Sequence, residues 1–119
     1  MAKYVDGYVL PIKKSKFKAY QKMAKMGSNV WMKCGALSYT EAVGDDLDMK
    51  GVLSFNKLAK IKKDEVVVFA FVTYKSKSHR DQVNKRVHKT MVAKDFAHME
   101  MPFEMKKMAF GGFKVFAGK

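Results

Sequence analysis

A carboxylate inside an apolar, strand-like segment is the first residue of this sequence that could do chemistry. Asp6 lies in YVDGYVL, residues 4–10, where a buried charge is costly unless it is paired. Side chains alternate along a strand, so Tyr4 and Tyr8 are expected on the same face as Asp6. The segment therefore predicts a carboxylate flanked by two aromatic rings.

A second carboxylate has a similar setting. Glu41 alternates with Tyr39 in residues 36–43, which also have strand character. Together with Asp6 and its two tyrosines, these residues predict one pocket with an aromatic wall and a carboxylate able to act as a general base. The alternative is that Asp6 and Glu41 are structural, and that each is paired with a lysine or with a second protomer.

Polar residues also crowd the start of a predicted helix, within residues 75–84. His79, Arg80, Asp81 and Asn84 lie in its first turns, where the positive end of the helix dipole favours anions. Arg80 and Asn84 are one turn apart and share a face. This cluster predicts an anion or ligand site, with His79 as a further proton-handling group. Alternatively, Asp81 caps the helix and His79 faces water.

The sequence lacks metal-ligand spacing and the glycine motifs of cofactor sites. His79, His88 and His98 are nine and ten residues apart, and Cys34 has no Cys or His neighbour, so no metal and no cofactor are expected. Trp31 lies on the apolar stripe of a predicted helix. There it is either part of the core or a wall on which a ligand could stack.

The first predicted helix spans about residues 15–34. Ser15 is its expected N-cap and Gly35 its left-handed stop. Apolar residues recur at steps of three and four, which places six of them on one stripe: Phe17, Tyr20, Ala24, Gly27, Trp31 and Cys34.

The second helix is expected over residues 78–93, with Ser78 and Asp81 as a capping pair. Segments rich in β-branched and aromatic residues predict four strands, with a long insert between the second and the third. The continuous apolar run of the third strand indicates burial on both faces. In the last strand, Gly111-Gly112 indicates a bulge or a close backbone approach. The strands and the insert are residues 4–10, 36–43, 65–74, 107–116 and about 47–64.

The element order is β-α-β, insert, β-α-β, within a single domain of residues 1–119. Two such units predict a ferredoxin-like α+β fold, in which an antiparallel sheet carries both helices on one face. The other face would then expose the third strand together with Phe113 and Val115. We therefore expect a homodimer that packs sheet on sheet, as a dimeric α/β barrel. A bound partner protein would satisfy the same pattern.

Composition excludes several classes of protein. The 119 residues hold 24 Lys+Arg against 11 Asp+Glu, a net charge of +13, yet 48% of them are hydrophobic, which is too apolar for a disordered basic tail. Only Arg80 and Arg86 are arginines, so no specific nucleic-acid recognition is expected, although the charge can give weak binding to polyanions. With one Cys and no long apolar run or signal segment, we expect a cytoplasmic protein without membrane contact.

Four segments of the chain resemble a known family: YVDGYVLPIKK, the Trp31 helix ending at Gly35, VVVFAFVTYKSKSHRDQVN at residues 66–84, and MPFEMKKMAFGGFKVF at residues 101–116. They are similar to the YbaA-like bacterial family of unknown function, over nearly the whole chain. The resemblance implies the dimeric α/β-barrel superfamily, which includes small monooxygenases and decyclases acting on aromatic substrates. It implies no activity for this chain, because fold alone does not carry function.

Two functions remain open on the sequence. The first is binding of a small, aromatic organic molecule in a cavity between sheet and helices, with cofactor-free acid–base or oxygenase-type chemistry at Asp6, Glu41 or His79. The second is a homodimeric interaction module without a catalytic role. In the first, ligand contacts would come from aromatic and polar side chains: Tyr4, Tyr8, Trp31, Tyr39, Arg80 and Asn84.

Overall fold

Four strands form one antiparallel sheet in a computed structural model that describes residues 2–94 and 101–119. β1 and β3 occupy the centre of the sheet and pair from Tyr4 opposite Tyr74 to Lys13 opposite Glu65. The predicted α+β class with an antiparallel sheet is confirmed. The strand order is β2-β3-β1-β4, with bounds β1 Tyr4–Lys13, β2 Ser38–Val43, β3 Glu65–Tyr74 and β4 Ala109–Lys114.

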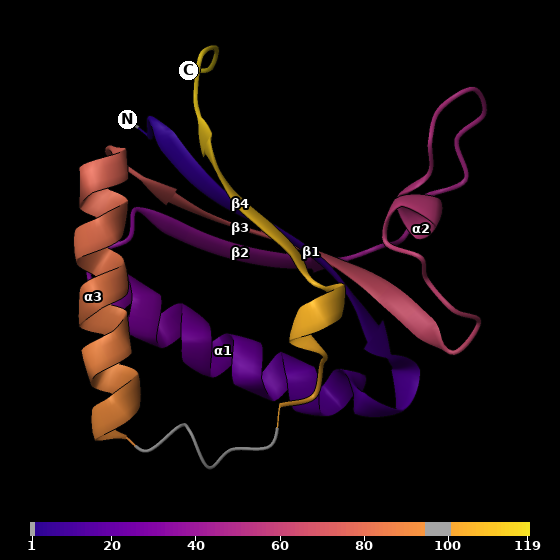
Figure 1. Ribbon diagram of the computed structural model, residues 1–119, viewed down its shortest axis with the longest axis horizontal. Coiled ribbons are helices and arrows are strands. Elements are labelled where there is room, and N and C mark those ends of the chain that lie inside the picture. Colours follow the sequence, from indigo (N-terminus) through magenta and orange to yellow (C-terminus); the bar gives the residue numbers. More distant parts are fainter. Residues whose placement is uncertain (1, 95–100) are drawn as a thin grey trace.

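Two long helices, α1 (Phe17–Lys33) and α3 (Lys77–Ala93), form a second layer. Figure 1 shows α1 running along the sheet and α3 standing across one end of it. The molecule measures 39 × 39 × 20 Å. Figure 1 looks down the shortest of these dimensions, and in it α1 lies below the sheet, so the two layers stack across one of the longer dimensions.

The core lies between these two layers. Leu10, Val68 and Val72 project from one face of the sheet, because residues two apart on a strand point the same way. They pack in two clusters against the apolar stripes of the helices, with Tyr20 and Val30 from α1, Cys34 from its C-cap, and Val83 and Val87 from α3.

The first strand and helix differ from the sequence prediction at their ends. β1 continues past the predicted stop at Leu10, through Pro11. β4 pairs with β1 only as far as Val9. No strand therefore lies beside Pro11 on that side, and the N–H that proline lacks costs no hydrogen bond of the sheet. At the start of α1 the predicted Ser15 cap is wrong, because residues 14–16 form a 3₁₀ turn, η1 (Lys14–Lys16). Gly35 ends the helix with a φ of +110°, as predicted.

The cap of α3 also differs. Ser76 accepts a hydrogen bond from the backbone N–H of His79 at 3.0 Å, so the predicted capping pair of Ser78 and Asp81 is wrong. Asp81 instead forms an ion pair with Arg80, 2.7 Å from its Nε. Two serines in the run KSKS could each begin the helix, and the upstream one does.

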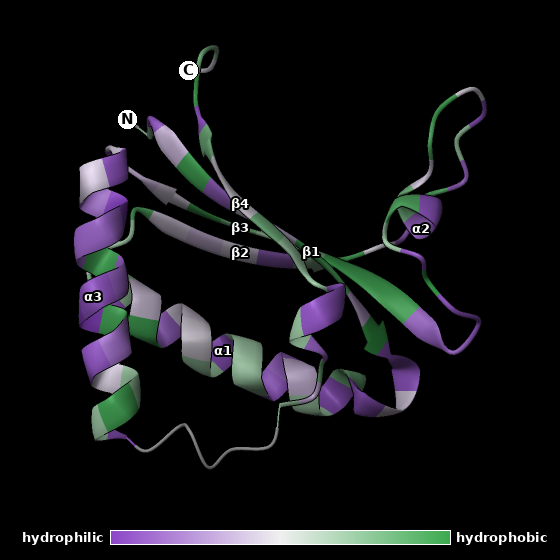
Figure 2. Ribbon diagram, in the orientation of Figure 1, coloured by the Kyte–Doolittle hydropathy of each residue, from purple (hydrophilic) through white to green (hydrophobic). Residues whose placement is uncertain are grey.

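Within one chain, β3 is covered on the helix side and is largely open on the other, as the predicted fold implies. Val68 and Val72 on the helix side are 2% and 1% exposed, whereas Phe69 on the other side is 46% exposed. Phe113 of β4, on the same open face, is 62% exposed. Figure 2 shows hydrophobic colouring along much of β3, which supplies apolar residues to both faces.

Gly112 allows a close approach in β4. The pairing of β1 with β4 runs in register without a bulge, and a Cβ on Gly112 would lie 2.3 Å from the hydroxyl of Tyr4. The predicted close approach is therefore confirmed.

The segment between β2 and β3 contains a short helix, α2 (Phe55–Leu58), capped by Ser54. The ring of Phe55 lies 6.4 Å from that of Phe69, at the edge of the open sheet face. Residues 95–100 lie outside the described part, and a 3₁₀ turn, η3 (Met105–Lys107), precedes β4. Across residues 2–94 and 101–119, no helix has the length and apolar character needed to cross a bilayer.

We predict that Gly35→Ala lowers the free energy of unfolding by about 1–2 kcal/mol, because φ near +110° is strained for a residue with a Cβ. Urea unfolding measures the change. Gly118→Ala is the matched control, since Gly118 has no positive φ and open space around it apart from Val115 at 3.7 Å. Equal losses in the two variants would contradict the role of Gly35 as the helix stop.

Candidate functional site

A cavity of about 210 Å³ lies between the sheet and the helices, and we call it the inner cavity. Four methionines make part of its wall, and their flexible thioethers can adapt to differently shaped occupants: Met23, Met91, Met101 and Met108. The aromatic part of the wall comes from both layers: Tyr8, Tyr20, Trp31, Tyr39 and Phe103.

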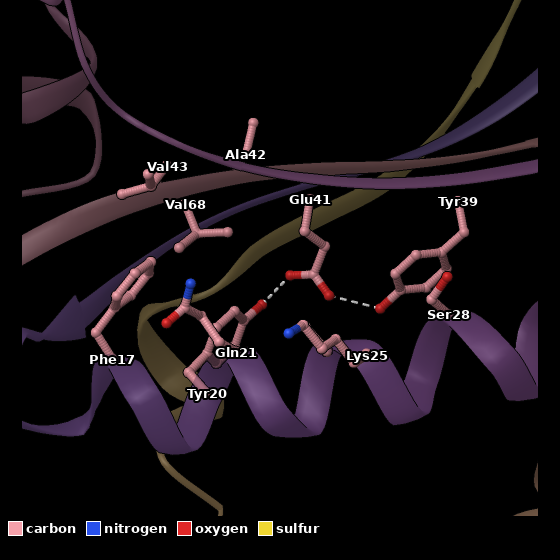
Figure 3. A pocket seen from close by; sticks show the side chains of 11 residues that line it. Phe17, Tyr20, Gln21, Lys25, Ser28, Tyr39, Glu41, Ala42, Val43 and Val68 are labelled. Carbon is pink, nitrogen blue, oxygen red and sulfur yellow. Dashed lines mark hydrogen bonds between the residues drawn. The ribbon is translucent and has the colours of Figure 1, made fainter.

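A second space, of about 290 Å³, lies between α1 and β2, and we call it the outer groove (Figure 3). Phe17 and Lys25 of α1 line it together with Val43 of β2. Four residues line both spaces and therefore form the boundary between them: Tyr20, Ala24, Tyr39 and Glu41.

Glu41 is the charged residue of that boundary. Its side chain points from β2 toward α1, as Figure 3 shows. The hydroxyl of Tyr39 donates a hydrogen bond to Oε2 at 2.6 Å, and the hydroxyl of Tyr20 donates one to Oε1. A carboxylate has about four lone-pair sites, so two hydroxyl donors leave it able to accept further hydrogen bonds.

The two tyrosines are held in their protonated form. Burial raises the pKa of Tyr20 and of Tyr39, and the hydrogen bond of each hydroxyl to Glu41 raises it further. Burial also raises the pKa of Tyr8, in the same wall. At neutral pH these hydroxyls are therefore neutral hydrogen-bond donors.

Gly27 makes room for this arrangement. A Cβ on Gly27 of α1 would lie 3.0 Å from the hydroxyl of Tyr39, which is closer than most such contacts. The ring of Trp31, one turn further along α1, lies 5.8 Å from that of Tyr39. Within the described residues the indole Nε1 of Trp31 is buried without a hydrogen-bond partner.

Asp6 lies in a separate cluster. Its side chain is 0% exposed, and Arg80 donates from Nη1 to Oδ1 at 2.7 Å. Asp6 is therefore paired as the structural alternative proposed, but its partner is an arginine of α3 and not a lysine. The guanidinium also lies over the ring of Tyr4, 5.1 Å from its centroid. Burial raises the pKa of Asp6, and the charge of Arg80 partly opposes that rise.

The single pocket predicted from the two carboxylates is divided. Sheet register places Asp6 in a row with Tyr39 across β3, and Tyr8 in the adjacent row with Glu41. All four point to the helix side, but of the two carboxylates only Glu41 lines the inner cavity. The structure therefore brings Tyr8, Trp31, Tyr39 and Glu41 together, and it places Asp6 and Tyr4 with Arg80.

The remaining predicted residues lie on α3, away from the inner cavity. The Nδ1 of His79 accepts a hydrogen bond from the backbone N–H of Lys75 at 2.9 Å. Asn84 accepts one from the hydroxyl of Tyr74 at 3.5 Å, and burial raises the pKa of that tyrosine to about 12. Over the described ranges, no three His, Cys, Asp or Glu side chains gather in a way that could hold a metal ion.

Tyr20 and Gly27 are the site residues that the sequence prediction missed. Both lie on the predicted apolar stripe of α1, where they read as core. The available signal on that stripe was a tyrosine, which carries a hydroxyl, and a glycine seven residues further on, which leaves room for a neighbouring side chain. Their contacts with Glu41 and Tyr39 depend on where α1 lies relative to β2, and spacing along the chain does not reveal that position.

We predict that Arg80→Met lowers the free energy of unfolding at pH 7 by about 3 kcal/mol, because it leaves Asp6 buried without a cation. In the folded variant the pKa of Asp6 then lies further above its unfolded value of 3.8. A raised carboxyl pKa costs stability as pH rises, so the deficit against the wild type should shrink as the pH falls toward about 4. Urea unfolding at several pH values measures this.

Lys85→Met, on an exposed position of the same helix, is the control and should have a small, pH-independent effect. A deficit of Arg80→Met that stays constant between neutral and acid pH would contradict the assigned ion pair.

Comparison with known proteins places the chain in a family. Residues 3–105 match the family described as "Protein of unknown function (DUF1428)". The uncharacterized protein YbaA of Escherichia coli strain K12 is 35% identical over 112 residues, which cover 94% of this chain and 95% of YbaA. The YbaA of Shigella flexneri matches to the same extent. The chain therefore belongs to the DUF1428 family of proteins of unknown function.

Proposed function

We propose that this protein binds a small, single-ring organic molecule in the inner cavity. The observation that carries the proposal is the cavity itself, whose aromatic and methionine wall surrounds one polar anchor, Glu41. Ligand sites are typically concave and apolar with a few convergent polar groups, and the inner cavity has that composition.

The volume limits the size of the ligand. Liquid water occupies about 30 Å³ per molecule, so a cavity of about 210 Å³ corresponds to roughly seven waters. Sites for drug-sized ligands are typically about 300–1,000 Å³. A compound with one aromatic ring and a short polar arm fits this space, whereas a fused-ring compound would need the outer groove as well.

Glu41 is the group that we propose for proton handling. Of the three candidates from the sequence, it alone lines the inner cavity, whereas Asp6 is engaged by Arg80 and His79 by the backbone of Lys75. A proton on an acidic group of the bound molecule, such as an ammonium or a phenol, would move to a carboxylate oxygen of Glu41 and leave its electron pair on the ligand nitrogen or oxygen, with Tyr20 and Tyr39 holding that carboxylate in place.

Trp31 supplies a built-in test, because it is the one tryptophan of the chain and lies in the cavity wall. We expect 2-phenylethanol to change its fluorescence, with a dissociation constant of about millimolar or tighter. Ala24→Phe, which fills the boundary of the cavity, should abolish the change. Ala19→Phe on an exposed position of the same helix should leave it intact.

No change in wild-type fluorescence, or the same change in Ala24→Phe as in the wild type, would contradict binding in the inner cavity. Thermal unfolding of both variants shows whether they are folded, so a loss of binding cannot be confused with a loss of structure.

We further propose that the fold is ferredoxin-like and that two copies pack their open sheet faces together as a dimeric α/β barrel. The strand order β2-β3-β1-β4 and the two long helices on one face support the first inference. For the second, three successive rows of four residues cross the open face without a single charged side chain: Ala42, Phe69, Val9, Ala109; Thr40, Phe71, Gly7, Gly111; and Ser38, Thr73, Val5, Phe113.

A second copy suits this face better than a charged partner does. The chain carries a net charge of +13, so two copies repel unless they meet where charge is absent. Exposed Phe69 and Phe113 form an apolar surface that a second copy can cover. The same face favours the second candidate function, a homodimeric interaction module without a catalytic role.

We predict that Phe69→Lys weakens self-association about tenfold or more, because it places two like charges at the proposed interface. Sedimentation equilibrium measures the dissociation constant. Val92→Lys is the control, since Val92 is an exposed apolar residue on α3 and lies off the open sheet face. A monomeric wild type, or equal association of the two variants, would contradict the proposed dimer.

A further inference from the structure

We infer that the inner cavity selects a cation, namely a small amine attached to an aromatic ring. The inference rests on the proposed function and names the chemical class of its ligand. It starts from the charge inside the cavity, which is opposite in sign to that of the protein. Among the described residues that line the cavity, Glu41 carries a negative charge and none is Lys, Arg or His.

Glu41 differs from the other inward-facing carboxylate in how it is compensated. Asp6 has an arginine at 2.7 Å, whereas both hydrogen bonds to Glu41 come from neutral tyrosine hydroxyls. In the described part of the chain, no lysine or arginine nitrogen lies within 4.0 Å of Glu41. A carboxylate held in a partly dry site without a cation is suited to accept a charged N–H donor.

The surrounding rings favour the same ligand. The faces of tyrosine and tryptophan rings carry negative charge density and attract cations within about 6 Å. The ring centroids of Tyr39 and Trp31 lie 5.8 Å apart, and the hydroxyl of Tyr39 donates a hydrogen bond to Glu41. An ammonium that donates to Glu41 would therefore sit beside aromatic rings, with its own ring in the apolar part of the cavity.

Two features of the protein work against a cation, and neither removes the preference. The net charge of +13 repels cations at long range, but at physiological salt charges are screened beyond about 8 Å. Lys25 lines the outer groove but not the inner cavity. An anionic ligand in the groove would use Lys25, so the two possibilities predict different effects of replacing it.

Three matched probes at physiological salt and neutral pH test the inference: 2-phenylethylamine, which is a cation, 2-phenylethanol, which is neutral, and 3-phenylpropionate, which is an anion. Binding is followed by the fluorescence of Trp31 and by the thermal shift. We expect the amine to bind about tenfold or more tightly than the alcohol, as a charge-assisted hydrogen bond implies, and the anion to bind most weakly.

Glu41→Gln should reduce the preference for the amine to about unity while the alcohol still binds. Glu104→Gln, a matched change at an exposed carboxylate outside the cavity, should keep the preference, and so should Lys25→Met. If the alcohol binds but the amine binds no better, the inference is wrong and the proposed function stands. If no probe binds, the proposed function fails with it. Tighter binding of the anion that is lost in Lys25→Met would overturn the inference in favour of an anion site.

Discussion

Two carboxyl side chains project from the sheet toward the helices, Asp6 from β1 and Glu41 from β2, and a charge in that layer must be compensated. Asp6 is fully buried and is compensated by the guanidinium of Arg80. Glu41 is half-buried and is compensated by the hydroxyls of Tyr20 and Tyr39. A guanidinium neutralises a carboxylate, whereas two hydroxyls orient it and leave its charge in place. This difference separates a structural ion pair from a group that can act on a ligand.

The position of α1 makes the second kind of compensation possible. Tyr20 of this helix lies against Glu41. Further along the helix, Gly27 lies against Tyr39, and Trp31 lines the inner cavity. A Cβ at Gly27 would press against the hydroxyl of Tyr39. Because Gly27 has none, a tyrosine of β2 and a tyrosine of α1 can both donate hydrogen bonds to Glu41. The residues that bury the helix are thus also the residues that shape the site.

Sequence patterns predict the elements of this fold well and the contacts between them poorly. The strand at 65–74 and the stripe of α1 follow from local spacing, and Asp6 and Glu41 stand out because charge is rare in apolar strands. Arg80 and Tyr20 could not be assigned as their partners, because each pairing joins distant segments and depends on strand order and helix placement. The apolar run of β3 indicates burial on both faces, but it does not reveal whether the chain itself or another molecule covers the open face.

Glu41 is the group that we propose as the anchor of a ligand inside the inner cavity. A crystal structure of the protein with bound 2-phenylethylamine would show this anchor. We expect the ammonium within hydrogen-bond distance of a Glu41 carboxylate oxygen, with the aromatic ring beside Tyr8 and Trp31. The proposal would be contradicted by an inner cavity that is closed by protein side chains, or by an amine that binds only on the outer surface with Glu41 still bonded to its two tyrosines alone.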